Sequence, residues 1–510
     1  MIERRFNLID EAWIPVTGRG LVSLKQIFSD TTLSALGGDP VQKIAILKLL
    51  LAIAQSACTP EDTKAWKDLG IQGMCKKVLA YLDTWHDAFW LYGNTPFLQI
   101  PAIEKAEKKS YGTVLPMVAT GNTTVLTQIH IEKPLSDAEK AQVLVQLMGF
   151  ALGGKKTDNS VVLTPGYRGK SNEKGKPSTG KPGPSVGFKG FLHSFVMGSS
   201  LAQTVWLNLF TGEELTQIKF YPAGIGVAPW ERMPQGEDDE VARQLKGSYM
   251  GRLVPLCRFV LLKEDGLHYS EGIAHPDYTN FVVDPSVAVD FSSKKPRVIW
   301  VDTEKKPWRQ LTALLSFMGD TSNKNTFECL QLKTVIQRLT KTNLESFAIW
   351  SGGMQASSNA GEQYFSGNDD FVESEVQLSA SIFKNESIFY ATLQEEMDYM
   401  ERMASILWAS VKGYYADSMA DGTNFASQAT SLFWQLCERD FQKLVTACYA
   451  DSSGEKAREM RRIFEGNVYR GYDLYCPNQT ARQLEAWISN RPRLWKNRET
   501  NTKEVVANHA

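Results

Sequence analysis

The chain has 510 residues, of which 43% are hydrophobic and 22% are charged, and its net charge is −1 at neutral pH. This length is more than one hydrophobic core normally serves, so two or three domains are expected, and the composition is typical of a soluble globular protein. A free-standing DNA-binding protein would usually be more basic. Any contact with nucleic acid is therefore expected through local patches, or through partners that supply most of the positive charge.

No targeting or membrane segment stands out in the sequence. The N-terminal stretch MIERRFNLID lacks the apolar core of a signal peptide. The longest apolar run, Ile44 to Ala54, is short and is interrupted by Lys48, so we expect no membrane span. These features predict a cytoplasmic protein.

The usual motifs of catalysis and metal binding are missing from the sequence. The seven cysteines are scattered without a CxxC pair, and the six histidines show no HExxH spacing. No GxSxG motif occurs either. We therefore expect no catalytic residue, no metal and no cofactor, although a metal site assembled from distant parts stays an open alternative.

The N-terminal elements are predicted from local signals. Phe6 to Val16 is predicted as a short strand closed by a turn at Pro15, and Leu21 to Phe28 as a further β element. Asp39-Pro40 is typical of a helix start, because Asp caps the helix and Pro occupies its first position. Helical spacing of apolar residues then continues to Cys58, and a second helix is expected from about Met74 to Leu91.

The next segments alternate between irregular and regular structure. NTPFLQIP, from Asn94 to Pro101, is expected to be irregular, and Gly112 to Ile131 reads as a polar connector. Asp137 to Leu152 is predicted as a helix capped by Ser136. Phe191 to Leu209 is predicted as a strand followed by a helix.

Several short elements fill the region before the C-terminal part. Acidic Gly236 to Val241 is predicted as a surface turn. Arg252 to Leu262 reads as a strand, followed by part of a hairpin at Gly266 to Gly272. A further strand is expected at Arg297 to Val301 and a helix at Trp308 to Phe317.

Helical periodicity dominates from about Gln377. Helices are expected at about 384–416, 423–450, 454–475 and 479–489, with short connections that favour an up-down four-helix bundle. The predicted fold class is therefore α+β: a mixed α/β domain with long irregular loops over residues 1–375, and a C-terminal four-helix bundle over residues 376–510.

The most unusual stretch is the glycine-rich loop from Thr164 to Gly190, with seven glycines, four prolines, six Lys or Arg, and one acidic residue. Part of it, GKPSTGKP, nearly spells a phosphate-binding P-loop. Pro182 stands where Ser or Thr should hold magnesium, and the prolines forbid the helix that must follow, so we reject NTPase activity. A basic loop suits contact with phosphates, while a flexible linker would have the same composition.

A second candidate is SGGMQAS, from Ser351 to Ser357, which follows an apolar strand predicted at Leu344 to Trp350. Its two glycines are expected to make a sharp turn, with Gln355 at the tip of a loop. Glutamine carries both donors and acceptors, so it can meet base edges. An ordinary hairpin tip is the alternative.

Several motifs resemble one family when they are taken in order. FNLIDEAWIPV near the start, NTPFLQ, TPGYRG, the apolar segment ending in LNL, GGMQAS and the C-terminal bundle resemble the large subunit, CasA, of the type I-E CRISPR surveillance complex Cascade. The resemblance covers essentially the whole chain. It implies a non-catalytic subunit near the 5′ end of the crRNA. That subunit reads the protospacer-adjacent motif (PAM) in double-stranded DNA, starts strand separation and docks a helicase-nuclease.

The resemblance also implies which residues of this sequence contact nucleic acid. The family's minor-groove loop is similar to Gly166, Tyr167, Arg168 and Gly169, and its glutamine wedge resembles Gln355, with Gly352 and Gly353 shaping the turn. Lys263 is the candidate for the family's hairpin lysine. The loop that docks at the crRNA end is similar to the segment holding Asn122, Thr123, Thr124 and Gln128. The expected partners are target DNA, crRNA, other Cascade subunits and the helicase-nuclease.

The C-terminal bundle ends in a modest basic excess. Arg491, Arg493, Lys496 and Arg498 could follow a DNA strand, or could belong to an ordinary solvated helix face. Two functional alternatives remain open at this point. One is a purely structural scaffold in a ribonucleoprotein, and the other is a stand-alone enzyme acting on nucleic acid.

Overall fold

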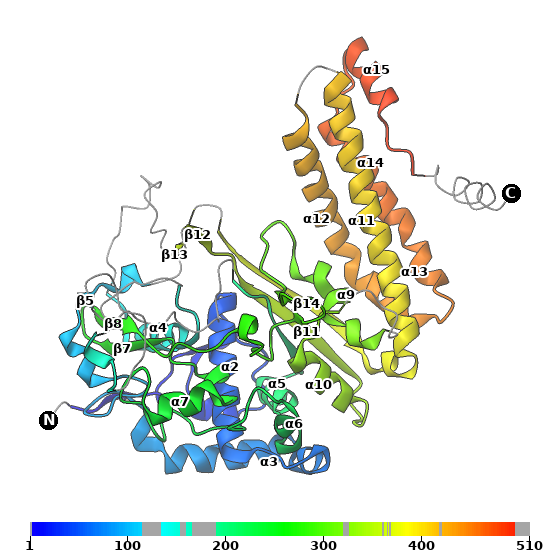
Figure 1. Ribbon diagram of the computed structural model, residues 1–510. Coiled ribbons are helices and arrows are strands. Elements are labelled where there is room, and N and C mark those ends of the chain that lie inside the picture. The colour runs from blue at the N-terminus through cyan, green and yellow to red at the C-terminus, as the bar shows by residue number, and fades with distance from the viewer. Residues whose placement is uncertain are drawn as a thin grey trace. The chain divides into compact units, whose positions relative to one another are not determined.

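The computed structural model describes residues 3–114, 134–152, 160–165, 190–319, 326–359, 362–364, 366, 369–417 and 421–494. The chain divides into two compact units. The first comprises Met1–Leu314 with Lys324–Val376, and the second comprises Leu315–Asn323 with Gln377–Ala510. The predicted α+β fold class is confirmed, since a region of mixed helix and sheet precedes a helical C-terminal region (Figure 1). The sequence did not indicate that the short segment 315–323 belongs with the C-terminal helices.

The first unit contains ten described α-helices and fourteen strands, the last of which crosses the division between the units. Its helices are α1 (Leu24–Ser29), α2 (Pro40–Cys58), α3 (Thr63–Thr84), α4 (Asp137–Gly149), α5 (Leu201–Asn208), α6 (Gly212–Gln217), α7 (Glu240–Lys246), α8 (Met250–Leu253), α9 (Leu311–Leu314) and α10 (Leu330–Leu339). Its strands are β1 (Arg5–Asn7), β2 (Ile14–Val16), β3 (Gly20–Val22), β4 (Trp90–Tyr92), β5 (Lys108–Lys109), β6 (His193–Met197), β7 (Arg258–Leu262), β8 (Leu267–Glu271), β9 (Val289–Asp290), β10 (Arg297–Val298), β11 (Ser346–Met354), β12 (Ser357–Asn359), β13 (Glu362–Tyr364) and β14 (Phe371–Ser379). Short 3-10 turns connect them, among them η2 (Pro101–Lys105) and η5 (Tyr278–Asn280).

Helix α2 is the core helix of the first unit. It begins as predicted, with Asp39 and Gln42 forming a reciprocal capping box and Pro40 in the first turn. It packs against α3, α4, α5 and β11 (Figure 1). By length and composition it could cross a membrane, contrary to our expectation, but 78% of its most apolar window is buried inside the protein. Its apolar residues therefore serve the core.

Two three-stranded sheets organise the first unit around this helix. In the first, β11 lies between β14 and β6, and its pairing with β6 is antiparallel with Gly352 opposite His193. In the second, β8 lies between β5 and β7, and the predicted hairpin is confirmed by antiparallel pairing of β7 with β8. The remaining described sheets have two strands each.

Several sequence predictions for this unit were wrong in their elements. The helix expected from Met74 to Leu91 is the second half of α3, which ends at Thr84 before β4. The segment predicted as β at Leu21 to Phe28 contains helix α1, because Ser23 and Gln26 form a capping box that starts a helix. The predicted surface turn at Gly236 to Val241 leads into α7, and its Glu237 is buried. The strand expected from Arg252 begins only at Arg258, after the short helix α8.

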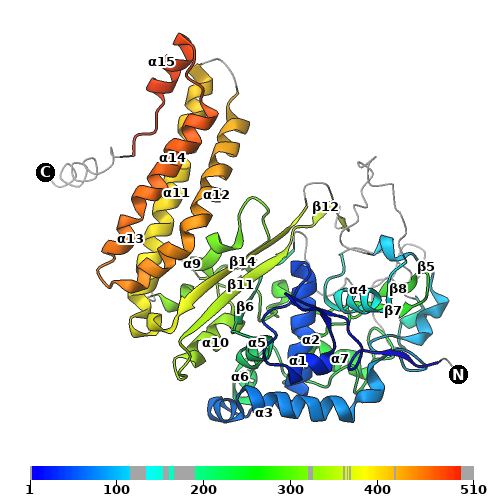
Figure 2. The same cartoon turned by 180° about the vertical axis from the view of Figure 1, so that it is seen from behind.

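The second unit is helical, with α11 (Glu386–Asp417), α12 (Thr423–Ala450), α13 (Glu455–Glu459), α14 (Arg461–Tyr475) and α15 (Ala481–Ser489). The long helices α11, α12 and α14 lie side by side (Figure 2). The third predicted helix is two helices, which meet at Met460. Arg461 joins α14 to α11 through a bidentate bond to the buried carboxylate of Glu396, at 2.6 to 3.1 Å.

Candidate nucleic-acid interface

A buried polar chain supports the sheet that carries the predicted Gln355 site. Lys48 of α2 forms an ion pair with Asp284, and both side chains are almost fully buried. Asp284 also accepts a hydrogen bond from the Ser286 hydroxyl at 2.7 Å, and that hydroxyl bonds His193 Nδ1 at 2.8 Å. Because His193 lies opposite Gly352 in the sheet, this chain links α2 to the end of β11.

Neighbouring groups keep the Asp284 carboxyl ionised. Burial, the largest single influence, acts to raise the pKa of this carboxyl. The nearby Lys48 and His193, together with hydrogen bonds from Lys48 and Ser286, outweigh burial and lower that pKa to about 2. In the sequence, Lys48 only interrupts an apolar run. In the fold it is the buried partner of this carboxylate.

The described end of the glycine-rich loop lies beside the segment that follows β10. Residues Gly166 to Gly169, predicted to read the groove, lie outside the described residues, which resume at Gly190. There the chain is fixed by two backbone hydrogen bonds. The Val301 amide donates to the Gly190 carbonyl at 3.0 Å, and the Leu192 amide donates to Ile299 at 3.1 Å. The backbone at the end of the loop is therefore held by two hydrogen bonds to the segment that follows β10.

Gly352 and Gly353 do not form the predicted turn. Both lie inside β11, which continues to Met354. A Cβ on Gly353 would lie 2.6 Å from the Phe191 carbonyl oxygen and 2.7 Å from Val301 Cγ2. A Cβ on Gly352 would lie 2.6 Å from the Trp350 ring. These glycines thus permit close packing of neighbouring segments rather than a change of chain direction.

Gln355 follows directly after β11 and is half-buried rather than at a loop tip. Its backbone amide donates to the Asp370 carbonyl at 3.0 Å. Its side-chain Oε1 accepts hydrogen bonds from the amide and the hydroxyl of Thr303, at 3.2 and 3.3 Å. In this conformation the Gln355 side chain is therefore held against the segment that follows β10.

The chain beyond Gln355 forms a further hairpin, β12–β13, which the sequence did not predict. Asp369 anchors its base, because one carboxylate accepts hydrogen bonds from the Ser357 amide at 2.9 Å, the Ser357 hydroxyl at 2.8 Å and the Ser366 amide at 2.9 Å. The Asp369 carboxylate thus has a structural role at the neck of this hairpin.

These contacts bring together parts of the chain that are distant in sequence. Three segments are in contact here: the start of the segment after the glycine-rich loop at Phe191, the end of β11 at Gly353, and the segment from Val301 to Thr303. We call this group of segments the β11 junction. It is the candidate nucleic-acid interface of the first unit.

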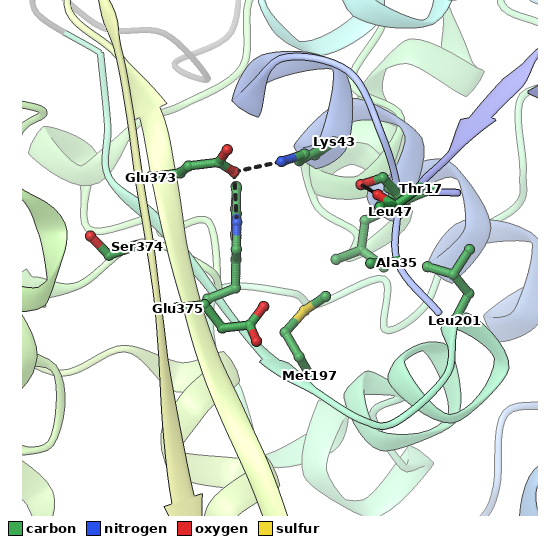
Figure 3. Close-up of a pocket in the computed structure, with 11 residues that line it drawn as sticks. Thr17, Ala35, Lys43, Leu47, Met197, Leu201, Glu373, Ser374 and Glu375 are labelled. Carbon is green, nitrogen blue, oxygen red and sulfur yellow. Dashed lines mark hydrogen bonds and ion pairs between the residues drawn. The ribbon is translucent and has the colours of Figure 1, made fainter. Parts of the chain in front are cut away.

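A pocket of about 320 Å³ lies beside the strands that lead to the β11 junction (Figure 3). At its rim, Glu373 of β14 accepts a hydrogen bond from the Trp350 indole at 3.0 Å and pairs with Lys43 of α2 at 2.7 Å. Apolar side chains form much of the remaining lining, with Leu36, Leu47, Met197 and Leu201 among them. Glu373 therefore ties β11 and β14 to α2, a role that no sequence motif indicated.

Lys263 lies where a hairpin lysine was predicted, at the turn between β7 and β8. Its ammonium is paired with Glu104 of η2 at 2.5 Å, and it is about one-third exposed. The hydrogen bond from Lys263 lowers the pKa of the Glu104 carboxyl. Lys263 could reach a phosphate only by exchanging this partner.

The other charges of the β7–β8 turn are paired in the same way. Glu264 pairs with Arg5 at 3.2 Å, and Asp265 pairs with Lys108 at 2.6 Å. Hydrogen bonds from these cations lower the pKa of both carboxyls. The turn is therefore a balanced set of ion pairs on the surface rather than a free basic patch.

In the second unit, Arg491 is engaged by its own neighbours. Its guanidinium lies 4.1 Å from the centre of the Trp487 ring and 5.2 Å from that of Tyr469, and it pairs with Asp473 at 3.2 Å. Arg493 is exposed. The other predicted contacts, Asn122, Thr123, Thr124, Gln128, Lys496 and Arg498, lie outside the described residues.

The titratable residues show no ready metal site within the described ranges. Among those residues, no group of three or more His, Cys, Asp and Glu side chains could hold a metal ion. All seven cysteines are buried, and burial raises the pKa of several of their thiols, Cys58 and Cys329 to about 12.

Comparisons with known proteins agree with the motif order seen in the sequence. Residues 7–469 match the family described as CRISPR-associated protein Cse1. The CRISPR-associated protein CasA/Cse1 of Thermus thermophilus is 26% identical over 345 residues, which span 62% of this chain and 61% of that relative.

Solved structures share the fold over nearly the whole length. Thermobifida fusca Cse1 matches with a TM-score of 0.73 at 19% identity, covering 96% of this chain and 97% of that one. Thermus thermophilus CasA matches with a TM-score of 0.71 at 19% identity, covering 95% and 98%. A chain of a CRISPR RNA-guided surveillance complex matches with a TM-score of 0.67 at 13% identity, covering 96% and 100%. From the family match over most of its length, the chain belongs to the CRISPR-associated Cse1 (CasA) family.

Proposed function

We propose that the chain is a non-catalytic, cytoplasmic subunit of an RNA-guided Cascade complex that recognises the PAM in double-stranded DNA and helps to start unwinding. Membership of the Cse1 family supports a role in CRISPR defence. The likeness to a chain of an RNA-guided surveillance complex is consistent with crRNA and other Cascade subunits as partners. A docking surface for the helicase-nuclease is part of the same proposal.

The observation that carries this proposal is the contact at Gly353. Its Cα lies so close to Phe191 that a Cβ would approach the Phe191 carbonyl within 2.6 Å. Phe191, which directly follows the glycine-rich loop, therefore packs against the strand only two residues before Gln355. A loop that contacts phosphates and a side chain that enters between base pairs need such a common, rigid base.

The proposed action of Gln355 requires a small local change. Its side chain must leave the two hydrogen bonds from Thr303, each contributing about 1 kcal/mol net. Opening the first base pairs costs a few kcal/mol, which an inserted side chain can offset in part. Because the minor groove distinguishes mainly A·T from G·C, such a reader is expected to accept several PAMs.

A scaffold without DNA contact is the second candidate, and one observation favours it. Both described polar residues assigned to DNA in the first unit are already bonded within the chain, Lys263 to Glu104 and Gln355 to Thr303. A stand-alone enzyme is the third possibility. Cleavage of nucleic acid by the purified chain with a divalent metal would establish that reading instead.

Replacing Gln355 by Ala is expected to slow duplex opening by the reconstituted complex on the order of tenfold. A side chain that meets base pairs contributes about 1–3 kcal/mol. Initial encounter with the duplex should change less. Opening can be followed by 2-aminopurine fluorescence next to the PAM, and encounter by stopped-flow anisotropy. Gly166→Asp should instead weaken encounter, because it adds a negative charge.

The matched control is Gln428→Ala, an exposed glutamine of α12 that bonds only its own helix neighbour Asn424 among the interactions described. It should leave both measurements unchanged. If Gln355→Ala and Gly166→Asp also leave PAM-dependent DNA binding by the complex unchanged, the chain is a scaffold without DNA contact.

Replacing Glu104 by Gln is expected to strengthen duplex binding by the complex, because it releases Lys263 for a phosphate. The plot of log affinity against log salt should steepen by about one unit. Asp265→Asn is the matched control, since it also removes one surface carboxylate that pairs with a lysine, but it releases Lys108 instead of Lys263. Equal effects of the two variants would show that Lys263 has no special contact.

A further inference from the structure

An exposed aromatic pair stands on the surface of the first unit. The rings of Phe281 and Phe291 stack with their centres 5.6 Å apart and their planes 26° from parallel. Phe281 is 56% exposed and Phe291 is 40% exposed. Large apolar side chains at such exposure are usually scattered singly, so a stacked pair is a feature that needs an explanation.

The backbone makes the pair more unusual. Phe281 follows η5 and has φ +61°, in the left-handed region that favours glycine or asparagine. A bulky aromatic residue is strained in this conformation, and such strain concentrates at functional sites. Packing does not explain the choice, because the Phe281 ring is mostly in solvent.

The pair is linked to the β11 junction first through the backbone of η5 and then through aromatic side chains. The Phe281 amide donates to the Tyr278 carbonyl at 3.0 Å. The Tyr278 ring meets Phe191 edge-on at 5.9 Å, and Phe191 lies 5.0 Å from Trp300. Phe191 is the residue whose carbonyl approaches Gly353. The exposed rings are therefore a continuation of the candidate interface.

Positive charge lies close to the pair in the sequence. Lys294 and Lys295 are exposed in the turn between β9 and β10, which begins just after Phe291. Three carboxylates lie on these segments. Asp284 pairs with Lys48 and Asp290 bonds Arg297, while Asp277 caps η5 and accepts a hydrogen bond from the Thr279 amide. The turn is thus left with an excess of positive charge.

We propose that Phe281 and Phe291 form a stacking platform for an unpaired base of single-stranded nucleic acid, with Lys294 and Lys295 attracting its phosphates. Aromatic rings accept any base, and adjacent cations hold the backbone. The platform rests on the proposed function, because unwinding at the β11 junction would produce an unpaired strand beside it. A protein partner would also cover apolar rings, but the flanking lysines favour a polyanion.

The test measures binding of the full chain to fluorescein-labelled dT20, to an abasic 20-mer with the same backbone, and to a 20-base-pair duplex. Phe281→Ala/Phe291→Ala should weaken dT20 binding by at least about fivefold. The abasic strand should bind equally to this variant and to the wild type. Lys294→Ala/Lys295→Ala should weaken binding of both dT20 and the abasic strand, and should reduce the salt dependence of that binding.

The matched control is Phe425→Ala, which removes a 41% exposed ring stacked on Tyr415 in the second unit. It should leave dT20 binding unchanged, and thermal melting should show all variants folded. The platform is overturned if the wild type does not bind dT20, if the double phenylalanine variant binds it within twofold of the wild type, or if that variant loses abasic binding equally. The same variant failing only to assemble with other subunits would also overturn it, in favour of a protein interface.

PAM-dependent binding of the reconstituted complex separates this proposal from the proposed function. If the complex still selects PAM duplexes while the phenylalanine variant binds dT20 normally, only the platform fails. If the complex selects PAM duplexes equally well without this chain, the proposed function fails instead.

Discussion

Replacing Asp284 by Asn is expected to lower the free energy of unfolding by roughly 3–5 kcal/mol, the largest loss we expect from a single change. The variant leaves the Lys48 ammonium buried beneath the sheet with no countercharge. The Ser286 hydroxyl also loses its charged acceptor, which weakens the link to His193. Urea unfolding of the full chain, followed by tryptophan fluorescence, measures the change.

Two further variants test whether the unpaired Lys48 charge causes the loss of stability in Asp284→Asn. Lys48→Met combined with Asp284→Asn removes both charges and should recover much of the loss, since breaking a buried pair costs more than replacing it. Asp440→Asn is the matched control, because its partner Lys443 is 71% exposed and such pairs contribute at most about 1 kcal/mol. Similar losses in Asp440→Asn and Asp284→Asn would contradict this account.

The pair also fixes the expected dependence on pH. The pKa of Asp284 is lowered to about 2 from its ordinary value of 3.8, so the folded state favours the ionised carboxyl. Its stabilising contribution is therefore complete above the ordinary pKa and is lost as pH falls through the folded value. The wild type should lose this contribution between about pH 4 and 2. Asp284→Asn, which has no carboxyl to protonate, should lack that part of the acid dependence.

The sequence predicted the elements whose signals are local. Asp39-Pro40 and Ser136 each mark a helix start, and both helices begin where the caps indicate. The bundle helices α11 and α12 also follow their periodicity closely. A cap or an apolar stripe acts over a few residues, so it can be read without knowledge of the fold.

The candidate site could not be assembled in this way, because its contacts join distant segments. Lys48 and Asp284 are 236 positions apart, and Gln355 and Thr303 are 52 apart. Gly352 and Gly353 misled the prediction for a related reason. Two consecutive glycines are typical of a turn, and only the neighbouring Phe191 and Trp350 show that they are needed for close packing.

The geometry at Gly353 leads to the second large expected effect. Gly353→Ala should lower the free energy of unfolding by about 1–3 kcal/mol, because its Cβ would lie 2.6 Å from the Phe191 carbonyl oxygen. That oxygen belongs to the backbone and cannot rotate away, so the β11 junction must separate. We therefore expect PAM-dependent DNA binding by the reconstituted complex to fall as well.

Gly466→Ala is the opposite case and serves as the control for Gly353→Ala. Gly466 lies inside α14, and a Cβ there would meet nothing within 4 Å among the described residues. Alanine should stabilise that helix by up to about 1 kcal/mol without changing DNA binding. Because the two substitutions are chemically identical, opposite signs in urea unfolding would assign the loss at Gly353 to its contact with Phe191. If Gly353→Ala lowers the free energy of unfolding by less than about 0.5 kcal/mol, Phe191 and β11 can separate without destabilising the fold. The β11 junction would then not be the rigid base that the proposed function requires.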